Sequence, residues 1–453
     1  MFKSINPATQ EILKEYNADS ISIIEQKITY ADKSYRFWRD ISYTQRAAYF
    51  KRAGENLRKN KEKFGTLITL EMGKPIKEAI AEIEKCALIC DYYADNAATF
   101  LKPIDKEING KTGRISFLPL GVIFGIFPWN YPFWQVFRFA VPTLMAGNTG
   151  IFKHSPNVPQ CAEAIEQVFI DSGFPEKVFQ NTFAEVKHTE SIIANKKIKA
   201  VTLTGSERAG SSVAALAGKY IKKSVLELGG SDPFIVFPDA NIDEAVEAGI
   251  TSRYQNCGQS CIAAKRFIIH ETIYDTFLDK FISKVETLKV DNPMDETTNV
   301  GPMARKDLQK QLQDQVEDAV KKGAHLLAGG AGMNSKGNYF APAVLVDIPK
   351  DSRAYKEELF GPVASVYKFK TEAEAIEIAN ATDFGLGGSV WTKAEDLAHR
   401  MANKIETGSV YINELVKSMP EMPFGGVKNS GYGRELSEFG IHEFVNTKTI
   451  FNY

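Results

Sequence analysis

The sequence lacks several features that would place it in a large functional class. Its cysteines are few and odd in number, five in 453 residues, which disfavours a disulfide-stabilised secreted protein and favours reduced thiols in the cytoplasm. The formal net charge is only −1, so we expect neither a nucleic-acid partner nor a membrane-surface partner. Residues 1–16 contain no apolar stretch, so we expect no secretory signal. The cysteines are Cys86, Cys90, Cys161, Cys257 and Cys261.

A long uninterrupted apolar run is also missing. The most apolar segment is Gly121–Gly147, whose only charge is Arg138. Three prolines, Pro128, Pro132 and Pro142, interrupt it, and proline breaks the continuous helix that a membrane span requires. We therefore predict a buried strand, a turn and a buried helix here, with no membrane association.

Common cofactor and metal motifs are absent as well. The chain has no GxGxxG loop and no GKS or GKT sequence, so it is not a P-loop protein. None of its six histidines lies in a catalytic signature. Cys86 and Cys90 stand four residues apart in a predicted helix, but no other Cys or His has matching metal-ligand spacing. Core packing explains this pair better than metal binding, and we predict no metal site.

The sequence does contain a regular alternation of strand and helix patterns. Strands are expected at 112–118, 121–127, 149–153, 178–183, 200–204, 234–236 and 266–270. Helices are expected at 20–61, with Thr44 as an N-cap, and at 75–100, 131–146, 159–172, 206–217, 242–255, 273–288, 308–322, 375–381 and 394–404. This rhythm predicts an α/β protein with parallel sheets, and its length predicts two or three domains. The turn residues 229–233 mark a boundary, 425–433 a loop and 443–453 a strand that pairs with another chain.

The stretch Tyr254–Cys261, YQNCGQSC, is the first candidate for chemistry. If the preceding helix ends near Asn256, the loop presents backbone amides beside the Cys261 thiol, and Gly258 lets the backbone approach a substrate closely. Such surroundings lower a thiol pKa and supply an oxyanion donor. A small buried loop residue is the alternative interpretation.

Two polar residues in apolar surroundings are candidates for supporting roles. Glu227 lies between leucines before a glycine pair, and an acid in such surroundings has a raised pKa and can act as a general base. The alternative is a strand-end glutamate that faces solvent. Asn130, within Pro128–Pro132, must hydrogen-bond either an oxyanion or a turn carbonyl.

The cofactor signal is indirect. Gly205 and Ser206 join a predicted strand to a helix start, where free backbone N–H groups and the helix dipole bind phosphate. Lys153, at the end of another predicted strand, can reach a ribose or a phosphate. Neither feature identifies a ligand alone.

Taken together, the motifs resemble those of the aldehyde dehydrogenase superfamily in order and spacing. They are PWNYP at 128–132, TGSERAG at 204–210, LELGG at 226–230, NCGQSC at 256–261, EELFGPV at 357–363 and PFGGVKNSGYGRE at 423–435. The likeness runs from INPATQE at 5–11 to the final strand. FPWNYPFWQVFRFAVP and KHSPNVP are most similar to the short bacterial succinate-semialdehyde dehydrogenases.

This resemblance implies a fold and a domain plan. It implies a Rossmann-type parallel-sheet cofactor domain at 1–100 and 120–229, and an α/β catalytic domain at 230–427. It also implies a small β oligomerisation arm at 101–119 and 441–453, and hence a homodimer or homotetramer.

The resemblance also implies the roles of individual residues. Cys261 matches the nucleophile, Glu227 the general base, and Asn130, with the Cys261 backbone N–H, the oxyanion donor. Cys257 matches a bystander position, with a redox partnership as the alternative. The implied reaction oxidises an aldehyde to an acid through a thiohemiacetal and a thioester, without a metal. The residues implied to bind the cofactor are Trp129, Lys153, Ser155, Gly205, Ser206, Glu358 and Phe360.

Two positions depart from the family pattern. Where NAD-using relatives often carry a glutamate for the ribose 2′-hydroxyl, this chain has Pro156, which binds neither that hydroxyl nor a 2′-phosphate. We therefore predict NAD or NADP, with a slight preference for NAD. In the longer succinate-semialdehyde dehydrogenases, two arginines and a serine hold the distal carboxylate; Arg138 and Ser418 match two of these, but Gln255 replaces the second arginine. The alternative for Arg138 is a bridge between helices or an ion pair with an interface acid.

The predicted function is NAD(P)-dependent oxidation of an aldehyde with a distal carboxylate, succinate semialdehyde first. A dehydrogenase of broad specificity for aliphatic or hydroxy-aldehydes is the second hypothesis. A cofactor-independent thiol esterase and an inactive structural protein are the hypotheses from other classes.

Overall fold

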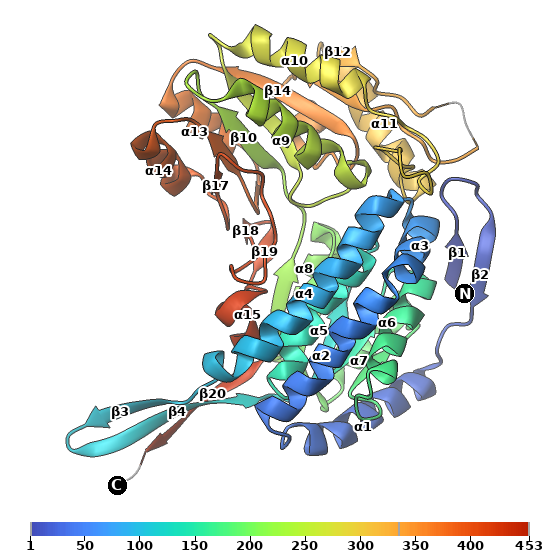
Figure 1. Cartoon of the computed structure of the whole chain (residues 1–453), viewed down its shortest axis with the longest axis vertical. Helices are drawn as coiled ribbons and strands as arrows, with labels where there is room; N and C mark the ends of the chain where they lie inside the picture. Colours follow the sequence, from blue (N-terminus) through green and yellow to red (C-terminus); the bar gives the residue numbers. More distant parts are fainter. Residues whose placement is uncertain (1, 334–335, 452–453) are drawn as a thin grey trace.

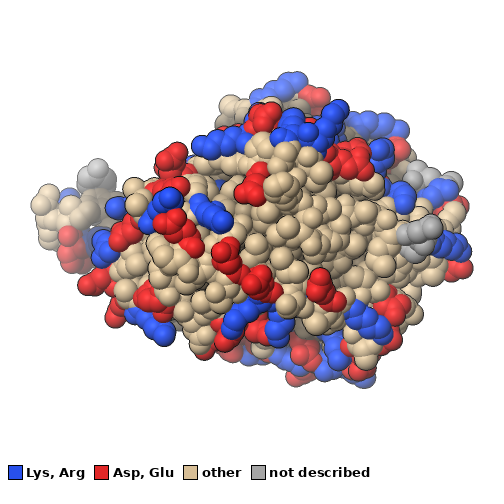
Figure 2. Space-filling model, turned by 90° about the horizontal axis from the view of Figure 1, so that it is seen from above, with Lys and Arg blue, Asp and Glu red and all other residues tan. Residues whose placement is uncertain are grey.

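The computed structural model describes residues 2–333 and 336–451 of the chain. Figure 1 shows two sheet-and-helix bodies, one above the other, and a narrow β arm that projects from the lower body. The α/β class predicted from the alternation is therefore confirmed. On the face seen in Figure 2, basic and acidic side chains lie intermixed around an uncharged central area.

The lower body is built on a six-stranded sheet in the order β19-β9-β8-β5-β6-β7. Its strands are β5 (Val122–Ile126), β6 (Thr149–Lys153), β7 (Phe179–Asn181), β8 (Ile198–Thr204), β9 (Lys223–Glu227) and β19 (Gly431–Tyr432). All neighbours are parallel except β19, which pairs antiparallel with β9. After β5, the chain adds β6 and β7 on one side of that strand and then crosses over to add β8 and β9 on the other side of β5. This is the strand order of a dinucleotide-binding fold, as predicted.

Helices cover this sheet and place the apolar segments in the core. They are α1 (Ile21–Trp38), α2 (Tyr43–Lys59), α3 (Lys61–Met72), α4 (Ile76–Phe100), α5 (Pro132–Met145), α6 (Pro159–Asp171), α7 (Thr189–Ala194) and α8 (Glu207–Lys219), with a short 3-10 turn η1 (Val186–His188). The helix expected over 20–61 is interrupted between α1 and α2. The N-cap of α2 is Ser42 and not the predicted Thr44, because Ser42 and Gln45 form a reciprocal capping box.

The upper body contains a seven-stranded sheet in the order β12-β13-β14-β11-β10-β16-β17. Its strands are β10 (Asp232–Val236), β11 (Ala264–His270), β12 (His325–Ala328), β13 (Ala343–Val346), β14 (Val363–Phe369), β16 (Ser389–Trp391) and β17 (Tyr411–Ile412). Its helices are α9 (Ile242–Tyr254), η2 (Gln255–Gly258), α10 (Tyr274–Glu286), α11 (Lys306–Lys321), α12 (Arg353–Lys356), α13 (Glu372–Asn380) and α14 (Glu395–Lys404). The chain passes from the first sheet to this one between β9 and β10, where the turn cluster 229–233 was predicted to mark a boundary.

The arm is a three-stranded antiparallel sheet in the order β20-β4-β3. Its strands are β3 (Ile104–Ile108), β4 (Lys111–Pro119) and β20 (Val445–Phe451), and the short helix α15 (Ser437–His442) precedes β20. The expected terminal strand pairs with β4 of its own chain, so it is not unpaired as predicted. It is an edge strand of this sheet, and its pairing with another chain stays a prediction. Residues 452–453 of the predicted arm lie outside the described residues.

The remaining strands are short antiparallel pairs. β1 (Phe2–Ile5) pairs with β2 (Ile12–Tyr16), and β15 (Phe384–Gly385) pairs with β18 (Val427–Lys428). The predicted loop 425–433 thus contains β18 and β19. Within residues 2–333 and 336–451, no helix is long and apolar enough to cross a membrane.

Candidate active site

The predicted site residues of the lower body gather at the carboxyl edge of its parallel sheet. In sheets of this kind, ligands bind outside the carboxyl ends of the strands where the strand order reverses, which here lies between β5 and β8. Trp129 and Asn130 follow β5, Lys153 ends β6, Gly205 and Ser206 follow β8, and Glu227 ends β9. The carboxyl edge of this sheet therefore brings together residues that lie up to about a hundred positions apart in the sequence.

The loop that carries Cys261 enters from the upper body and is tightly held. Helix α9 ends at Tyr254, after which Asn256, Cys257 and Gly258 adopt φ of 53°, 55° and 68°. Arg253 Nη2 donates to the carbonyl oxygens of Gly258 at 2.6 Å and Gly361 at 2.8 Å. A Cβ at position 258 would lie 2.4 Å from the Gly361 oxygen. Glycine is required there because the backbone approaches Gly361 this closely, while its approach to a substrate stays a prediction.

Asn130 lies against this loop. Its Nδ2 donates to the Gln259 carbonyl at 3.0 Å, and Asn256 Nδ2 donates back to the Asn130 carbonyl at 2.8 Å. Within the described chain, no acceptor takes the second N–H of the Asn130 amide or the backbone N–H of Cys261. Two donors therefore remain beside Cys261, which is what an oxyanion needs.

The two cysteines of the loop have different surroundings. Cys261 is partly buried against the core of the lower body, whereas Cys257 is 1% exposed in the core of the upper body. Burial raises the pKa of the Cys261 thiol to about 12, while the positive charges of Arg138 and Lys265 act in the opposite direction. Burial also raises the pKa of Cys257. The accessible thiol is therefore Cys261, and Cys257 packs away from it.

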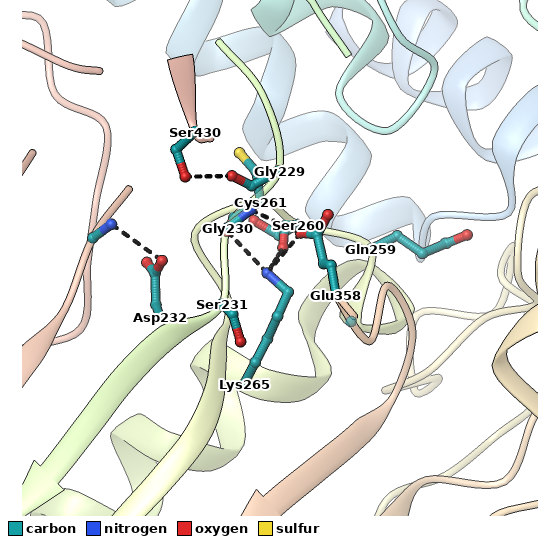
Figure 3. A network of polar contacts seen from close by, with 12 residues as sticks. Gly229, Gly230, Ser231, Asp232, Gln259, Ser260, Cys261, Lys265, Glu358 and Ser430 are labelled. Atoms are coloured by element: carbon teal, nitrogen blue, oxygen red, sulfur yellow. Dashed lines mark hydrogen bonds and ion pairs between the residues drawn. The ribbon is translucent and has the colours of Figure 1, made fainter. Parts of the chain in front are cut away.

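The glycine pair after β9 lets Glu358 and Cys261 come close to the strand end (Figure 3). A Cβ at Gly229 would lie 2.4 Å from Glu358 Oε2, and one at Gly230 would lie 2.5 Å from the Cys261 carbonyl oxygen. Gly230 N donates to Glu358 Oε1 at 3.1 Å. Lys265 Nζ pairs with the same oxygen at 3.1 Å and donates to the Ser260 and Cys261 carbonyls at 2.8 and 2.9 Å. Lys265 thus ties the thiol loop to Glu358.

Glu227 is buried and its carboxylate faces the C-terminal segment. It is 2% exposed, and neither carboxylate oxygen has a hydrogen-bond partner among the described residues. A Cβ at Gly425 would lie 2.7 Å from its Oε1. Burial, and then the nearby Glu435 carboxylate, raise the pKa of Glu227 well above its usual range, while Arg138 opposes this. The solvent-facing alternative is therefore wrong, and the raised pKa predicted from the sequence is confirmed.

The groups predicted to bind a dinucleotide fit that role. Ser206 caps α8 and Gly205 N donates to the Glu227 carbonyl at 2.9 Å, so the start of α8 lies at the sheet edge. Lys153 Nζ makes only a 3.4 Å contact with the His154 carbonyl and has no carboxylate partner among the described residues.

The other predicted cofactor residues make contacts of their own. The rings of Trp129 and Phe360 meet edge to face with centroids 5.9 Å apart. Ser155 Oγ donates to Asn157 Oδ1 at 2.6 Å. A buried lysine that has no counter-charge among the described residues is suited to a phosphate.

The predicted substrate residues are only partly brought together. Arg138 is 2% exposed, forms an ion pair with the buried Glu435 and stacks its guanidinium over Phe424 at 4.4 Å. The predicted alternative was a helix bridge or a pair with an interface acid, whereas the observed partner is a buried acid of the same chain. Arg138 Nε and Nη2 lack hydrogen-bond geometry to any acceptor among the described residues. Ser418 Oγ accepts from Trp134 Nε1 at 2.9 Å. Gln255 opens η2 as a partly buried residue.

Three charged residues of α4 were missed by the sequence analysis. Glu78 Oε2 accepts from Asn256 N at 2.7 Å, and burial raises the Glu78 pKa to about 7. Glu82 Oε1 accepts from the first backbone N–H groups of α5 at 2.9 and 3.0 Å. Lys85 Nζ donates to Ser418 Oγ at 3.1 Å. Their i, i+4, i+7 spacing places them on one helix face. The same face carries the buried Ile83 and Cys86, so charged residues on an apolar helix face were the sequence signal that could have identified them.

Cys86 and Cys90 are both fully buried in the hydrophobic core, as their packing interpretation predicts. Across residues 2–333 and 336–451, no group of three or more His, Cys, Asp or Glu side chains is arranged to hold a metal ion.

Known proteins resemble this chain along its whole length. Residues 1–450 match the model of the aldehyde dehydrogenase family. A Mycobacterium bovis protein named succinate-semialdehyde dehydrogenase (NADP(+)) 1 is 47% identical over 451 residues, 99% of each chain. A Synechocystis protein named probable succinate-semialdehyde dehydrogenase (NADP(+)) is 44% identical over 448 residues, also 99% of each chain.

Solved structures agree. The crystal structure of succinic semialdehyde dehydrogenase from Streptococcus pyogenes in complex with NADP+ has a TM-score of 0.97 and 36% identity over 99% of each chain. That of succinate-semialdehyde dehydrogenase from Burkholderia pseudomallei has a TM-score of 0.97 and 33% identity over 100% of this chain and 94% of the other. The names of the two sequence relatives and the bound NADP+ do not support the slight preference for NAD predicted above.

Proposed function

This chain belongs to the aldehyde dehydrogenase family, and we propose that it oxidises succinate semialdehyde to succinate with NADP as the electron acceptor. One observation carries the proposal: the Cys261 loop from the upper body meets Asn130 and the Glu227 strand end at the carboxyl edge of the lower sheet. A nucleophile, an oxyanion donor and a candidate base therefore share one place.

The first step belongs to Cys261. Its thiolate attacks the aldehyde carbon, a C–S bond forms, and the carbonyl oxygen becomes an alkoxide. The free N–H of Asn130 and the Cys261 backbone N–H stabilise that charge, and loss of one such donor typically costs about 3 kcal/mol of transition-state stabilisation. Arg138 and Lys265 favour the thiolate over the thiol.

When bound, the dinucleotide supplies the hydride acceptor. Gly205 and Ser206 would hold its pyrophosphate, Lys153 and Ser155 its adenosine side, Glu358 the nicotinamide ribose, and Trp129 and Phe360 the nicotinamide region. Two features support NADP over NAD. Pro156 places no carboxylate where it would repel a 2′-phosphate, and the nearby Lys153 has no counter-charge among the described residues.

Glu227 completes the reaction as general base. It takes a proton from water as the water oxygen bonds to the thioester carbon, the C–S bond breaks, and the Cys261 thiolate is regenerated. The raised pKa makes its carboxylate a stronger proton acceptor than an exposed glutamate. We propose that Arg138 and Ser418 orient the distal carboxylate of the substrate.

Two further properties are proposed with the function. The arm of β3, β4 and β20 would mediate a homodimer or homotetramer. A cytoplasmic location is supported by the five cysteines, all of which are free thiols.

The test uses purified protein with succinate semialdehyde or butanal, and with NADP or NAD, followed by dinucleotide absorbance. We expect kcat/KM to be at least tenfold higher for succinate semialdehyde than for butanal, and at least tenfold higher with NADP than with NAD. A tenfold difference is about what the free energy of one charge-assisted hydrogen bond produces. Cys261→Ser should abolish reduction. Equal rates with both aldehydes would favour the broad-specificity hypothesis, and ester hydrolysis without dinucleotide reduction would favour the esterase.

A further inference from the structure

We propose that Lys85 is a specificity-determining residue that binds the distal carboxylate of the substrate, in the role of the arginine that position 255 lacks. This inference rests on the proposed function and names a binding group within the same site. It comes from a contact between segments far apart in the sequence: Lys85 on α4 reaches Ser418, 333 positions later.

The geometry places three groups together. Lys85 Nζ lies 3.1 Å from Ser418 Oγ and 4.1 Å from the centre of the Trp134 ring on α5. Trp134 Nε1 lies 2.9 Å from the same Oγ. Ser418 is 4% exposed and Trp134 3% exposed, so both are fixed by packing. Figure 1 shows α4 and α5 side by side, which lets two helices supply this cluster.

Two groups of the cluster formed by Lys85, Trp134 and Ser418 can donate further hydrogen bonds. An indole N–H and an ammonium group only donate, so Ser418 Oγ accepts both bonds and its own O–H remains available. Within residues 2–333 and 336–451, that O–H finds no acceptor, and no carboxylate lies within ion-pair distance of Lys85 Nζ. An ammonium and a hydroxyl that both lack an acceptor match the two oxygens of a carboxylate.

Charge compensation distinguishes Lys85 from Arg138. Arg138 lies one helical turn beyond Trp134, but it is already paired with Glu435. Lys85 is therefore the cation of this cluster that forms no ion pair within the described chain, although the Glu82 carboxylate lies near enough to act on its pKa. Consistent with this, burial and then the positive charge of Arg138 lower the pKa of Lys85 to about 8. A bound carboxylate would supply the missing opposite charge.

The test compares Lys85→Met, which keeps the apolar stem, with Lys85→Arg, which keeps the charge. For Lys85→Met we expect the ratio of kcat/KM for succinate semialdehyde to kcat/KM for butanal to fall roughly 10- to 100-fold, mainly through KM, because a charged hydrogen bond is lost. Lys85→Arg should restore most of that ratio. Lys77→Met, on the exposed face of the same helix, is the matched control and should keep the wild-type ratio.

A second measurement guards against a folding defect. Succinate should inhibit butanal oxidation by the wild-type enzyme competitively, and its inhibition constant should rise roughly tenfold or more in Lys85→Met. An unchanged selectivity ratio and an unchanged succinate constant in Lys85→Met would overturn the proposal, as would equal losses with both aldehydes. A wild-type enzyme without preference for succinate semialdehyde would instead overturn the proposed function.

Discussion

At the scale of single residues, the site is governed by buried groups whose charge states differ from those in water. Cys261, Glu227 and Lys85 are all shifted by burial toward their neutral forms. Opposite charges from other elements offset part of this cost, such as Lys265 beside Cys261. Reactivity at these residues therefore depends on pH in a direction that the structure specifies.

For Cys261, the thiolate is the reactive form, and a raised pKa means that it is scarce at neutral pH. With a pKa of about 12, the thiolate fraction grows about tenfold for each unit by which the pH rises, as long as the pH stays well below the pKa. We therefore expect the rate of Cys261 alkylation by iodoacetamide, in the enzyme without dinucleotide, to rise about tenfold per pH unit from pH 7 to 9. Peptide mass spectrometry identifies the labelled cysteine.

The other four thiols provide the internal control, because each is at most 1% exposed and should label far more slowly. A rise of only about three- to fivefold between pH 8 and pH 9 would show that the pKa of Cys261 is near its ordinary value.

The identities of the central residues could be predicted from the sequence, but their partners could not. Asn130 and Glu227 stand out locally as polar residues in apolar segments, which limits their possible roles. Glu435, which faces Arg138, is nearly 300 positions away, and nothing near either residue indicates the pair. The contact of Gly258 with Gly361 was missed for the same reason.

At the scale of elements, α4 organises the site without carrying a predicted role. Along one face it binds the thiol loop through Glu78, caps α5 through Glu82 and reaches Ser418 through Lys85. Its existence and ends were predicted within one residue because a long periodic pattern determines them locally. The function of this face was not predicted, because it depends on which elements pack against it.

Glu82 gives the element-scale prediction. It forms an ion pair with Lys74, and both side chains are at most 1% exposed. Glu82→Gln keeps an oxygen for the α5 backbone N–H groups but removes the carboxylate that pairs with the buried Lys74. We expect the free energy of unfolding in urea to fall by about 3 to 5 kcal/mol.

Glu84→Gln on the exposed face of α4 is the control. Glu84 pairs with Lys61 in solvent, and such pairs contribute about 0 to 1 kcal/mol. Equal losses of stability in the two variants would contradict the role assigned to the buried pair.

At the scale of the whole molecule, the two sheets divide the chemistry between them. The lower sheet presents the carboxyl ends of its strands, and the upper sheet presents the loops that enter β11 and β14, which carry Cys261 and Glu358. The glycine pair after β9 is the point where these edges touch. The order of elements was predictable because sequence periodicity is local. The way the edges of the two sheets face each other was not, because it depends on tertiary packing.

The arm is the remaining feature of the whole molecule, and it projects away from the lower body (Figure 1). Ile104 and Ile108, on one face of the edge strand β3, are 43% and 49% exposed. Exposed apolar residues beside an unpaired strand edge are typical of an assembly surface. We therefore expect the double variant Ile104→Lys and Ile108→Lys to elute with the mass of a single chain in size-exclusion chromatography with light scattering, while the wild-type protein elutes as an oligomer. Val186→Lys, at an exposed position outside the arm, should keep the oligomer, and a wild-type mass for the double variant would place the interface elsewhere.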